Sequence, residues 1–216
     1  TRTFGKGNIL AGWYYFFDGK KICLRPLGFA EVFDEDKKDT VKPLIDRRFH
    51  GTDGEDITDI LLHSHEETLK DILKQRELFP RMEPTALPTM PQLRMVRCIR
   101  GEYELKETEN GRDFEDSIGM IADWRKRGMI YEVPYRCLYS HKLYNVISAG
   151  RCIGTDDGMW DISRVIPPCA VTGQAAGTAA ALTGDFSKLS YEELASALRK
   201  QGQRLKFAEL DETEGE

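Results

Sequence analysis

Residues 145–182 constrain the fold more than any other part of the chain, because they join a strand-like stretch to a helix of very small side chains. The apolar segment Tyr144–Ala149 predicts a short strand. Gly150, Gly154 and Gly158 punctuate the loop that follows it, so the backbone there can turn sharply or approach a neighbour closely.

The second half of this segment predicts a helix. Pro167 and Pro168 suit a first helical turn, where a missing N–H donor costs little. We expect the helix to begin near Pro168, to run to Leu182 and to stop at Gly184 as the C′ residue. Its smallest residues are Ala170, Gly173, Ala176, Gly177, Ala180 and Ala181. Such a helix can lie very close to a sheet or a ligand, and at roughly 15 residues it is too short to cross a bilayer.

A strand, a glycine-containing loop and a helix N-terminus together present backbone N–H groups and a partial positive charge to an anion. Phosphates or an electron-rich ring oxygen would suit such a site. A tightly packed α/β crossover, with glycines used only for close contact, explains the same pattern equally well. The motif is not GxGxxG, and no Walker lysine follows it.

Composition excludes several classes of protein. The chain has 216 residues, of which 40% are hydrophobic, enough for one large or two modest domains of a soluble globular protein. Its 31 basic and 36 acidic residues are mixed along the chain, without the clustered basic face of a nucleic-acid binder. No apolar run reaches the roughly 20 residues of a membrane span. Nucleic acid and membrane are therefore not expected partners.

Cysteine usage indicates the compartment. The five cysteines are widely spaced, odd in number and without a CxxC pair, so neither a disulfide framework nor a zinc site is expected. A reducing, cytoplasmic compartment fits best. His63 and His65 lie two apart on a helix pattern and therefore on different faces, so they cannot readily chelate one metal ion.

The N-terminal third predicts a small antiparallel meander. Trp13–Phe17 and Lys20–Leu24 read as two strands joined by a type I′ turn at Asp18-Gly19, and Phe29–Phe33 as a third strand. We interpret the aromatic residues as a sheet face packed on a core. A carbohydrate-binding platform built on Trp13 and Tyr15 is the alternative.

The middle of the chain predicts one long helix and a return to a sheet. Thr52–Glu55 has capping-box spacing, and apolar residues recur at helical period to about Leu78. The four prolines of Phe79–Pro91 indicate a connector. Gln92–Leu105 alternates like a strand with a bulge at Gly101, and Met129–Val133 predicts another short strand.

The C-terminal end predicts a helix and a tail. Ser190 with Glu193 has capping-box spacing for a helix through about Lys200. The acidic residues from Glu209 to Glu216 are expected to form a solvated tail.

Three segments carry a resemblance to a known family. Ser148–Ile153, Ser163–Pro167 and Thr172–Leu182 resemble, in order and spacing, the C-terminal FAD-contacting segment of the FAD-dependent oxidoreductase family with a glutathione-reductase-like fold. Pro91–Leu105, Asp116–Gly119 and Val133–Tyr139 resemble its substrate-domain strands and the crossing back to the FAD domain. The similarity covers the chain from about Pro91 to Leu205.

The resemblance implies a mixed α+β and α/β fold. Residues 1–143 would form an antiparallel-rich substrate-domain sheet with helices, residues 144–208 the last strand and helix of an FAD-binding domain, and residues 209–216 the tail. In such proteins an N-terminal βαβ unit with GxGxxG holds the adenine and pyrophosphate end of FAD. This sequence contains no such unit. We therefore expect a C-terminal portion whose partner is the missing N-terminal half, which agrees with a start at Thr1.

The resemblance assigns FAD-binding residues to the glycine loop. Ala149, Gly150 and Arg151 would approach the pyrophosphate and ribityl chain, with Cys152 beside them. No other cysteine lies near Cys152 in sequence, so we expect a small buried residue rather than a redox thiol.

The resemblance also assigns residues to the small-residue helix. Arg164, Val165 and Ile166 would lie at the pyrimidine edge of the isoalloxazine, where negative charge accumulates on reduction. Alternatively, Arg164 faces a substrate pocket or forms a salt bridge to an acid such as Asp161. The residues that would let the helix pack closely under the cofactor are Gly173, Gln174 and Gly177.

The implied activity is transfer of a hydride from a small organic substrate to FAD, by an oxidoreductase of which this chain is the C-terminal part. The alternative is a non-catalytic fragment or binding module that does not retain FAD alone. No general base stands out, because none of the histidines has a partner pattern; they are His50, His63, His65 and His141.

Overall fold

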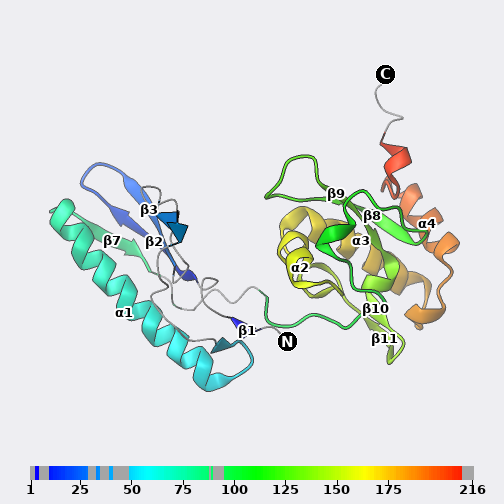
Figure 1. Cartoon of the computed structure of the whole chain (residues 1–216), viewed down its shortest axis with the longest axis horizontal. Coiled ribbons are helices and arrows are strands. Elements are labelled where there is room, and N and C mark those ends of the chain that lie inside the picture. The colour runs from blue at the N-terminus through cyan, green and yellow to red at the C-terminus, as the bar shows by residue number, and fades with distance from the viewer. Residues whose placement is uncertain are drawn as a thin grey trace. The chain divides into compact units, whose positions relative to one another are not determined.

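The computed structural model describes residues 3–4, 10–28, 33–34, 39–40, 49–87, 89 and 95–210. They belong to two compact units, Thr1–Val96 and Arg97–Glu216, which are considered separately below. Helices and small antiparallel sheets give a mixed α+β fold (Figure 1), as the sequence predicts at this coarse level. The expected division between a substrate domain, residues 1–143, and part of an FAD-binding domain, residues 144–208, is a different boundary from the one between these units, and it stays a prediction.

The first unit is a helix packed on a three-stranded antiparallel sheet. The sheet has the order β3 (Ile22–Gly28), β2 (Leu10–Phe17), β7 (Glu83–Ala86), and α1 (Gly54–Leu78) packs against β2. The buried side chains between them are Tyr14, Phe16, Ile72 and Met82. Two further antiparallel pairs are β1 (Thr3–Phe4) with β6 (Phe49–His50) and β4 (Phe33–Asp34) with β5 (Asp39–Thr40).

The predicted aromatic hairpin is confirmed, but its two-residue turn is wrong. Phe17 pairs with Ile22, so four residues form the connection. The Asp18 carboxylate accepts hydrogen bonds from the backbone N–H groups of Lys20 and Lys21 at 2.8 and 2.9 Å, which stabilises this wider turn. Burial of Tyr14 and Phe16 agrees with a core-facing role for the aromatic strand. The predicted strand Phe29–Phe33 falls outside the described residues except at Phe33.

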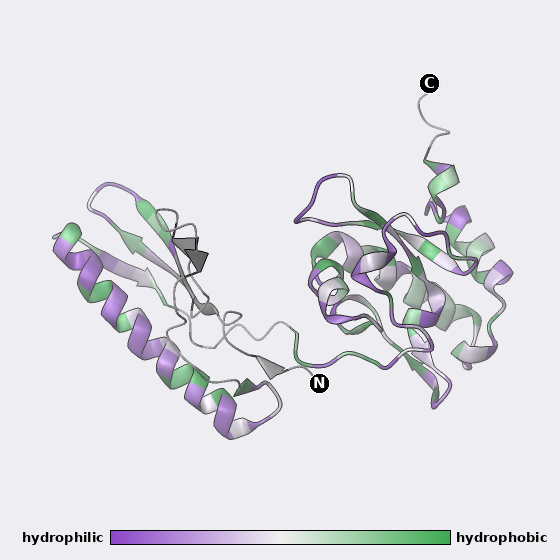
Figure 2. Ribbon diagram, in the orientation of Figure 1, coloured by the Kyte–Doolittle hydropathy of each residue, from purple (hydrophilic) through white to green (hydrophobic). Residues whose placement is uncertain are grey.

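The long helix is confirmed as α1, with a different cap. Asp53 is the N-cap residue and its carboxylate accepts from the N–H groups of Glu55 and Asp56, so Thr52 does not cap the helix. His63 and His65 are both exposed. Figure 2 shows the alternation of polar and apolar residues along this helix.

The proline-rich connector contains a strand that the sequence did not predict. In β7, Pro84 lies opposite Phe16. The strand is at the edge of the sheet, where a residue without an N–H group leaves no neighbouring carbonyl unpaired. The prolines therefore exclude a central strand, as expected, but not an edge strand.

The second unit packs one face of a helix of small residues into its core. Its main hairpin is β8 (Ser117–Ala122) with β9 (Ile130–Pro134), and a smaller antiparallel pair is β10 (Tyr139–Ser140) with β11 (Leu143–Ile147). The helices are α2 (Asp157–Ser163), α3 (Ile166–Leu182) and α4 (Tyr191–Lys200). α3 packs on both β8 and α4, and its buried residues belong to the core of this unit. Short 3-10 turns are η1 (Glu107–Glu109), η2 (Tyr135–Cys137), η3 (Gly150–Cys152), η4 (Phe186–Lys188) and η5 (Phe207–Glu209).

The predicted strand Gln92–Leu105 is wrong over its described part. Residues 95–104 form no strand, and Leu105 makes a single parallel bridge to Thr155. The backbone is held instead by separate neighbours, with the N–H of Tyr103 donating to Arg136 O and that of Leu105 to Gly154 O. From residue 100 to residue 105 the alternating polarity therefore follows alternating burial without a paired strand.

The other C-terminal predictions are largely confirmed. The strands near residues 129–133 and 144–149 correspond to β9 and β11, and α4 ends at Lys200 as expected. Ser190 is the N-cap of α4, but its hydroxyl donates to the Glu192 carboxylate and makes no capping bond. Glu209 is not part of a solvated tail, since it accepts hydrogen bonds from Arg199 and from the N–H of Leu205.

Candidate functional site

The turn after β11 is locked onto the first two turns of α3. Gly150 has φ of 64°, a left-handed value that favours glycine. Its N–H donates to the Thr172 hydroxyl at 2.8 Å, and that hydroxyl donates to Pro168 O at 2.7 Å. A Cβ on Gly150 would lie 2.9 Å from Cys169 Sγ. Gly150 is thus required by the packing of the chain itself, and its N–H is already used.

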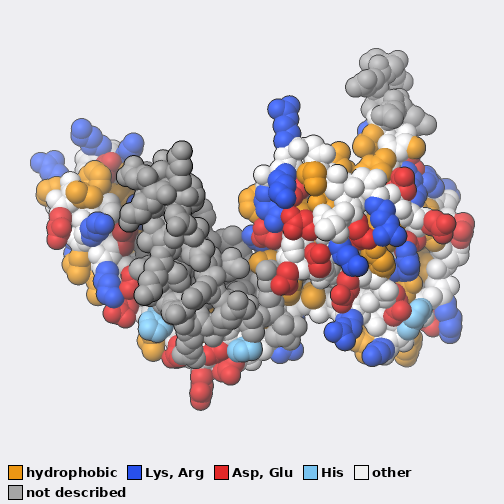
Figure 3. Space-filling view, in the orientation of Figure 1, with side chains coloured by type: hydrophobic (Ala, Val, Ile, Leu, Met, Phe, Trp, Pro, Cys, Tyr) orange, Lys and Arg blue, Asp and Glu red, His pale blue; other side chains and the backbone are white. Residues whose placement is uncertain are grey.

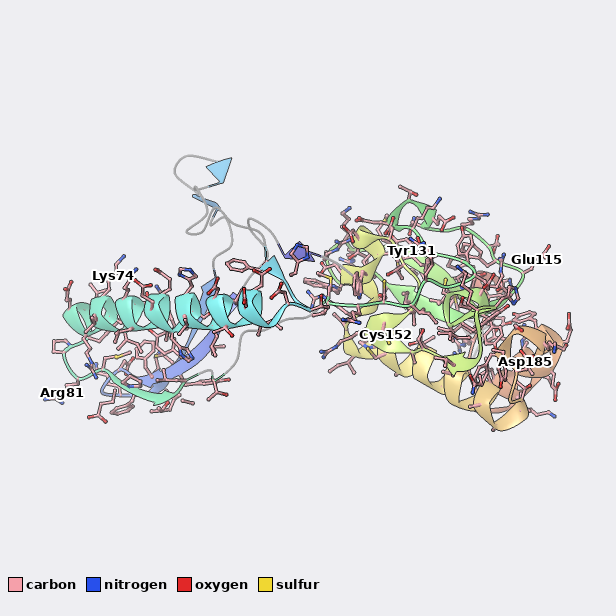
Figure 4. All side chains as sticks on the ribbon, turned by 90° about the horizontal axis from the view of Figure 1, so that it is seen from below. Lys74, Arg81, Glu115, Tyr131, Cys152 and Asp185 are labelled. Atoms are coloured by element: carbon pink, nitrogen blue, oxygen red, sulfur yellow. The ribbon has the colours of Figure 1, made fainter. Side chains whose placement is uncertain are left out.

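Arg151 and Cys152, which follow Gly150, are exposed. The Arg151 carbonyl accepts a hydrogen bond from Trp160 Nε1 at 2.6 Å, which ties the turn to α2. Cys152 Sγ donates to Ala149 O at 3.3 Å, and Figure 4 labels the residue next to α3. The expectation that Cys152 is buried is wrong, because the turn directs its side chain outward.

The N-terminus of α3 is open. The helix begins at Ile166, two residues before the predicted start, with Val165 as a cap residue that supplies no side-chain hydrogen bond. Ile166 is 84% exposed. Pro167 and Pro168 have no N–H, and the N–H of Cys169 donates to Val165 O. The helix dipole therefore persists, but Ile166 alone supplies an N–H from the helical residues 166–168.

Arg164 forms the salt bridge that was one of its alternatives. Its guanidinium binds the Asp161 carboxylate through Nε at 2.8 Å and through a terminal nitrogen at 2.7 Å. Arg125 approaches the same carboxylate at 3.5 Å. A hydrogen bond to Asp123 raises the pKa of Arg125, and the same bond lowers the pKa of Asp123. Arg164 thus belongs to a network of ion pairs that also contains Asp161, Arg125 and Asp123.

The two faces of α3 differ. Thr172, Ala175, Ala176 and Ala179 are buried against the rest of the unit. Gly173 and Gly177 are exposed, and a Cβ on either would meet no atom within 4 Å. One face of α3 is therefore open for close approach by another group.

Gln174 is also exposed, but its side chain is engaged. Its amide donates to Gln201 Oε1 at 3.0 Å, beyond the end of α4. Because the rise from Ile166 to Gly177 is about 16 Å, the predicted residues line the length of α3 rather than one small pocket.

Two positioning residues escaped the reasoning from sequence. Thr172 fixes Gly150, and Trp160 fixes Arg151, across separations of 22 and 9 residues. The only sign of the role of Thr172 in the sequence is that it is a polar residue between small apolar neighbours. Among the described residues, no group of three or more His, Cys, Asp or Glu side chains could hold a metal ion.

Comparison with known proteins supports the resemblance. The family model described as FAD dependent oxidoreductase matches residues 25–198. This match spans the glycine loop and α3 and extends further toward the N-terminus than the motifs do. No curated protein and no solved structure matches the chain. None of the helices in the described part of the chain is long and apolar enough to cross a membrane.

Proposed function

Since the chain belongs to the FAD dependent oxidoreductase family, we propose that it is the C-terminal part of an enzyme that transfers a hydride from a small organic substrate to FAD. The observation that carries this proposal is the open, apolar α3, which starts at an uncapped N-terminus beside a glycine turn. FAD, when bound, supplies the hydride acceptor.

The residues present fit such a cofactor along one side. The dipole and the Ile166 N–H at the start of α3 suit a ring oxygen that gains negative charge. The exposed Arg151 suits a phosphate, and Ala149 and Gly150 add little bulk there. The open positions Gly173 and Gly177 suit close packing. In this arrangement Arg164 stays bound to Asp161.

The other side of the site would come from an FAD-binding half that carries GxGxxG. β11 exposes Leu143, Tyr144 and Val146 at 51, 60 and 43%, and among the described strands it pairs with β10 alone. A helix without charged residues and with mostly small apolar ones, as α3 is, normally lies inside a protein. Both elements therefore present apolar surface that a further layer would cover.

We place the protein in a reducing compartment, the cytoplasm, because its five cysteines are free. A non-catalytic module that does not retain FAD alone is the competing function. The competing function is supported by the same geometry, since this chain would contact one side of the cofactor only.

The substitution Gly177→Leu tests the assignment. A Cβ there meets nothing within 4 Å in this chain and leucine favours a helix, but the added side chain would fill the space that the cofactor or its domain requires. We expect FAD affinity of the chain combined with its FAD-binding half to fall at least about tenfold, measured by titration of flavin absorbance.

Gly184→Leu is the matched control, because its Cβ also meets nothing within 4 Å but it lies beyond the end of α3. Its FAD affinity should equal that of the wild type. Equal affinity in Gly177→Leu would refute the assignment of α3. Absence of flavin binding in the combined wild-type protein would establish the non-catalytic alternative.

A further inference from the structure

The cysteines of the second unit lie around one turn, η3, whereas its acidic and basic side chains are mixed over the face that Figure 3 shows. Cys152 is the last residue of η3. Cys169 packs against the first residue of the turn, because a Cβ on Gly150 would lie 2.9 Å from Cys169 Sγ. The Cys137 carbonyl accepts a hydrogen bond from the Gly154 N–H at 2.8 Å, just beyond the turn.

A backbone hydrogen bond brings Cys98 beside Cys152, although the two are far apart in the chain. The N–H of Ile99, the residue after Cys98, donates to the Cys152 carbonyl at 2.8 Å. Standard backbone dimensions place each cysteine Cα about 2.4 Å from the nearer of these two atoms, so the two Cα atoms are at most about 7.6 Å apart. A disulfide joins Cα atoms that are about 4.4–6.8 Å apart, so it requires at most a small backbone movement here.

The two segments also stay together beyond the cysteines. A Cβ on Gly154 would lie 3.1 Å from the backbone nitrogen of Gly101. Cys98 and Cys152 are therefore held near each other by contacts on their C-terminal sides, and their proximity does not depend on one hydrogen bond.

The environments of the thiols indicate which of them reacts first. Cys152 is exposed and Cys98 is half-buried. Burial raises the pKa of the Cys98 thiol, and the negative charges of Glu104, Asp157 and a Cys152 thiolate raise it further, so the two thiols are close enough to interact. Oxidants react with exposed thiolates, which makes Cys152 the first thiol to be oxidised and Cys98 the second.

The other two cysteines of this unit are less suited to such a reaction. Cys137 is fully buried, and burial raises the pKa of its thiol, so oxidants are kept away from it. Cys169 Sγ is directed at the Arg164 carbonyl, at 3.8 Å, from within α3.

We propose that Cys98 and Cys152 form a redox-active dithiol, which hydrogen peroxide converts to a disulfide. The Cys152 thiolate attacks one oxygen of the peroxide, the O–O bond breaks, and hydroxide leaves as Cys152 becomes a sulfenic acid. Cys98 sulfur then attacks Cys152 sulfur, the S–S bond forms and the S–O bond breaks. The proton of the Cys98 thiol leaves with this oxygen as water. Two thiols are thus oxidised to one disulfide, and one peroxide is reduced to two molecules of water.

The disulfide would tie the segment before Gly101, which forms no strand, to η3. In a reducing compartment the dithiol stays open, so its closure responds to oxidising conditions. η3 carries residues that the proposed function assigns to FAD, but closure of the dithiol requires neither FAD nor a further half of the enzyme.

The test treats the fully reduced 216-residue chain, without FAD, with a small excess of hydrogen peroxide. The number of free thiols should fall by two from five. Digestion without reductant, followed by mass spectrometry, should recover the Cys98 peptide joined to the Cys152 peptide, about 2 Da lighter than the two together. Dithiothreitol should restore all five thiols.

Three variants assign the roles of the thiols. Cys98→Ser should leave Cys152 as a sulfenic acid, so labelling by dimedone should rise at least about tenfold over the wild type. Cys152→Ser should leave Cys98 reduced at the same dose of peroxide. Cys169→Ser is the matched control, because Cys169 also borders η3, and it should form the disulfide at the wild-type rate.

Five remaining thiols, a link from Cys152 to Cys169, or a disulfide between two chains would overturn the inference. The FAD titration of Gly177→Leu does not involve these cysteines, so failure of the dithiol and failure of the FAD assignment are distinguishable.

Discussion

Helices α3 and α4 pack against each other in the second unit, but the residues that they expose to solvent differ. α4 buries Leu194, Ala195 and Leu198, and it carries Glu192 and Glu193 in its first turn and Arg199 and Lys200 in its last. This is the pattern of a surface helix whose charges complement its dipole. α3 contains no Asp, Glu, Lys, Arg or His at all, but one of its faces is exposed.

The difference shows which helix has its apolar residues covered within the unit and which helix leaves them exposed. α4 satisfies its own apolar face within the unit, so nothing further needs to cover it. α3 has the composition of an interior helix and leaves Gly173, Gly177 and Ala180 open. Because these side chains are small, the backbone of α3 is accessible to a flat group or to another main chain. The candidate site is thus recognised by exposed small residues rather than by polar ones.

The largest effect expected concerns the buried face of α4. Leu198→Ala should lower the free energy of unfolding by about 2–5 kcal/mol, because Leu198 is fully buried and truncation leaves a cavity. Urea unfolding followed by tryptophan fluorescence measures it. Leu182→Ala, at the 37% exposed end of α3, should cost less than about 1 kcal/mol. If the two variants lost equal free energies of unfolding, α3 would be covered within this chain and the difference between the two helices would not hold.

A smaller effect of opposite sign is expected on the open face of α3. Gly173→Ala should stabilise the chain by about 0.5–1 kcal/mol, since alanine favours a helix and its Cβ has free space. Thermal unfolding provides the measurement. Gly119→Ala is the opposite case, because Gly119 has φ of 145° and a Cβ there would lie 2.7 Å from Val171 Cγ1. A destabilised Gly173→Ala chain would show that the open face of α3 is in contact with something.

The smallest effect expected is a pH-dependent change in stability at the C-terminal end of α4, where Arg199 binds Glu209. Burial raises the pKa of Glu209, but hydrogen bonds from the Leu205 N–H and from Arg199 outweigh it and hold this pKa below the ordinary value of 4.5. A lowered carboxyl pKa contributes stability above the unfolded value, and this contribution is lost as the pH falls through the folded pKa. The loss should be below about 1 kcal/mol, because Arg199 is half exposed.

Amide hydrogen exchange measures whether this pH dependence is confined to α4. Protection of the last turn of α4, corrected for intrinsic rates, should fall between neutral pH and pH values below 4.5, and Glu209→Gln should remove that dependence. The amides of α3 serve as the internal control, since that helix has no carboxylate. An identical pH response in the variant would contradict a role for Glu209.

The sequence predicted the features that depend on neighbours in the chain. The periodicity that ends near Leu78 gave α1, and the paired prolines with their small-residue run gave α3 to within two residues at its start. The family followed from the same run. The strand expected over Gln92–Leu105 is wrong in its described part, residues 95–105, because alternating polarity indicates alternating burial and does not indicate whether another strand lies alongside.

What the sequence determined by itself is that α1 and α4 are charged, that α3 is not, and where these three helices lie to within about two residues. The tertiary structure alone decided that the Gly150 N–H is taken by Thr172, that the Arg151 carbonyl is taken by Trp160, and that the glycine face of α3 is open. These facts depend on contacts between segments brought together by packing. No local pattern in the sequence specifies which donor will meet which acceptor, or which apolar face will remain uncovered.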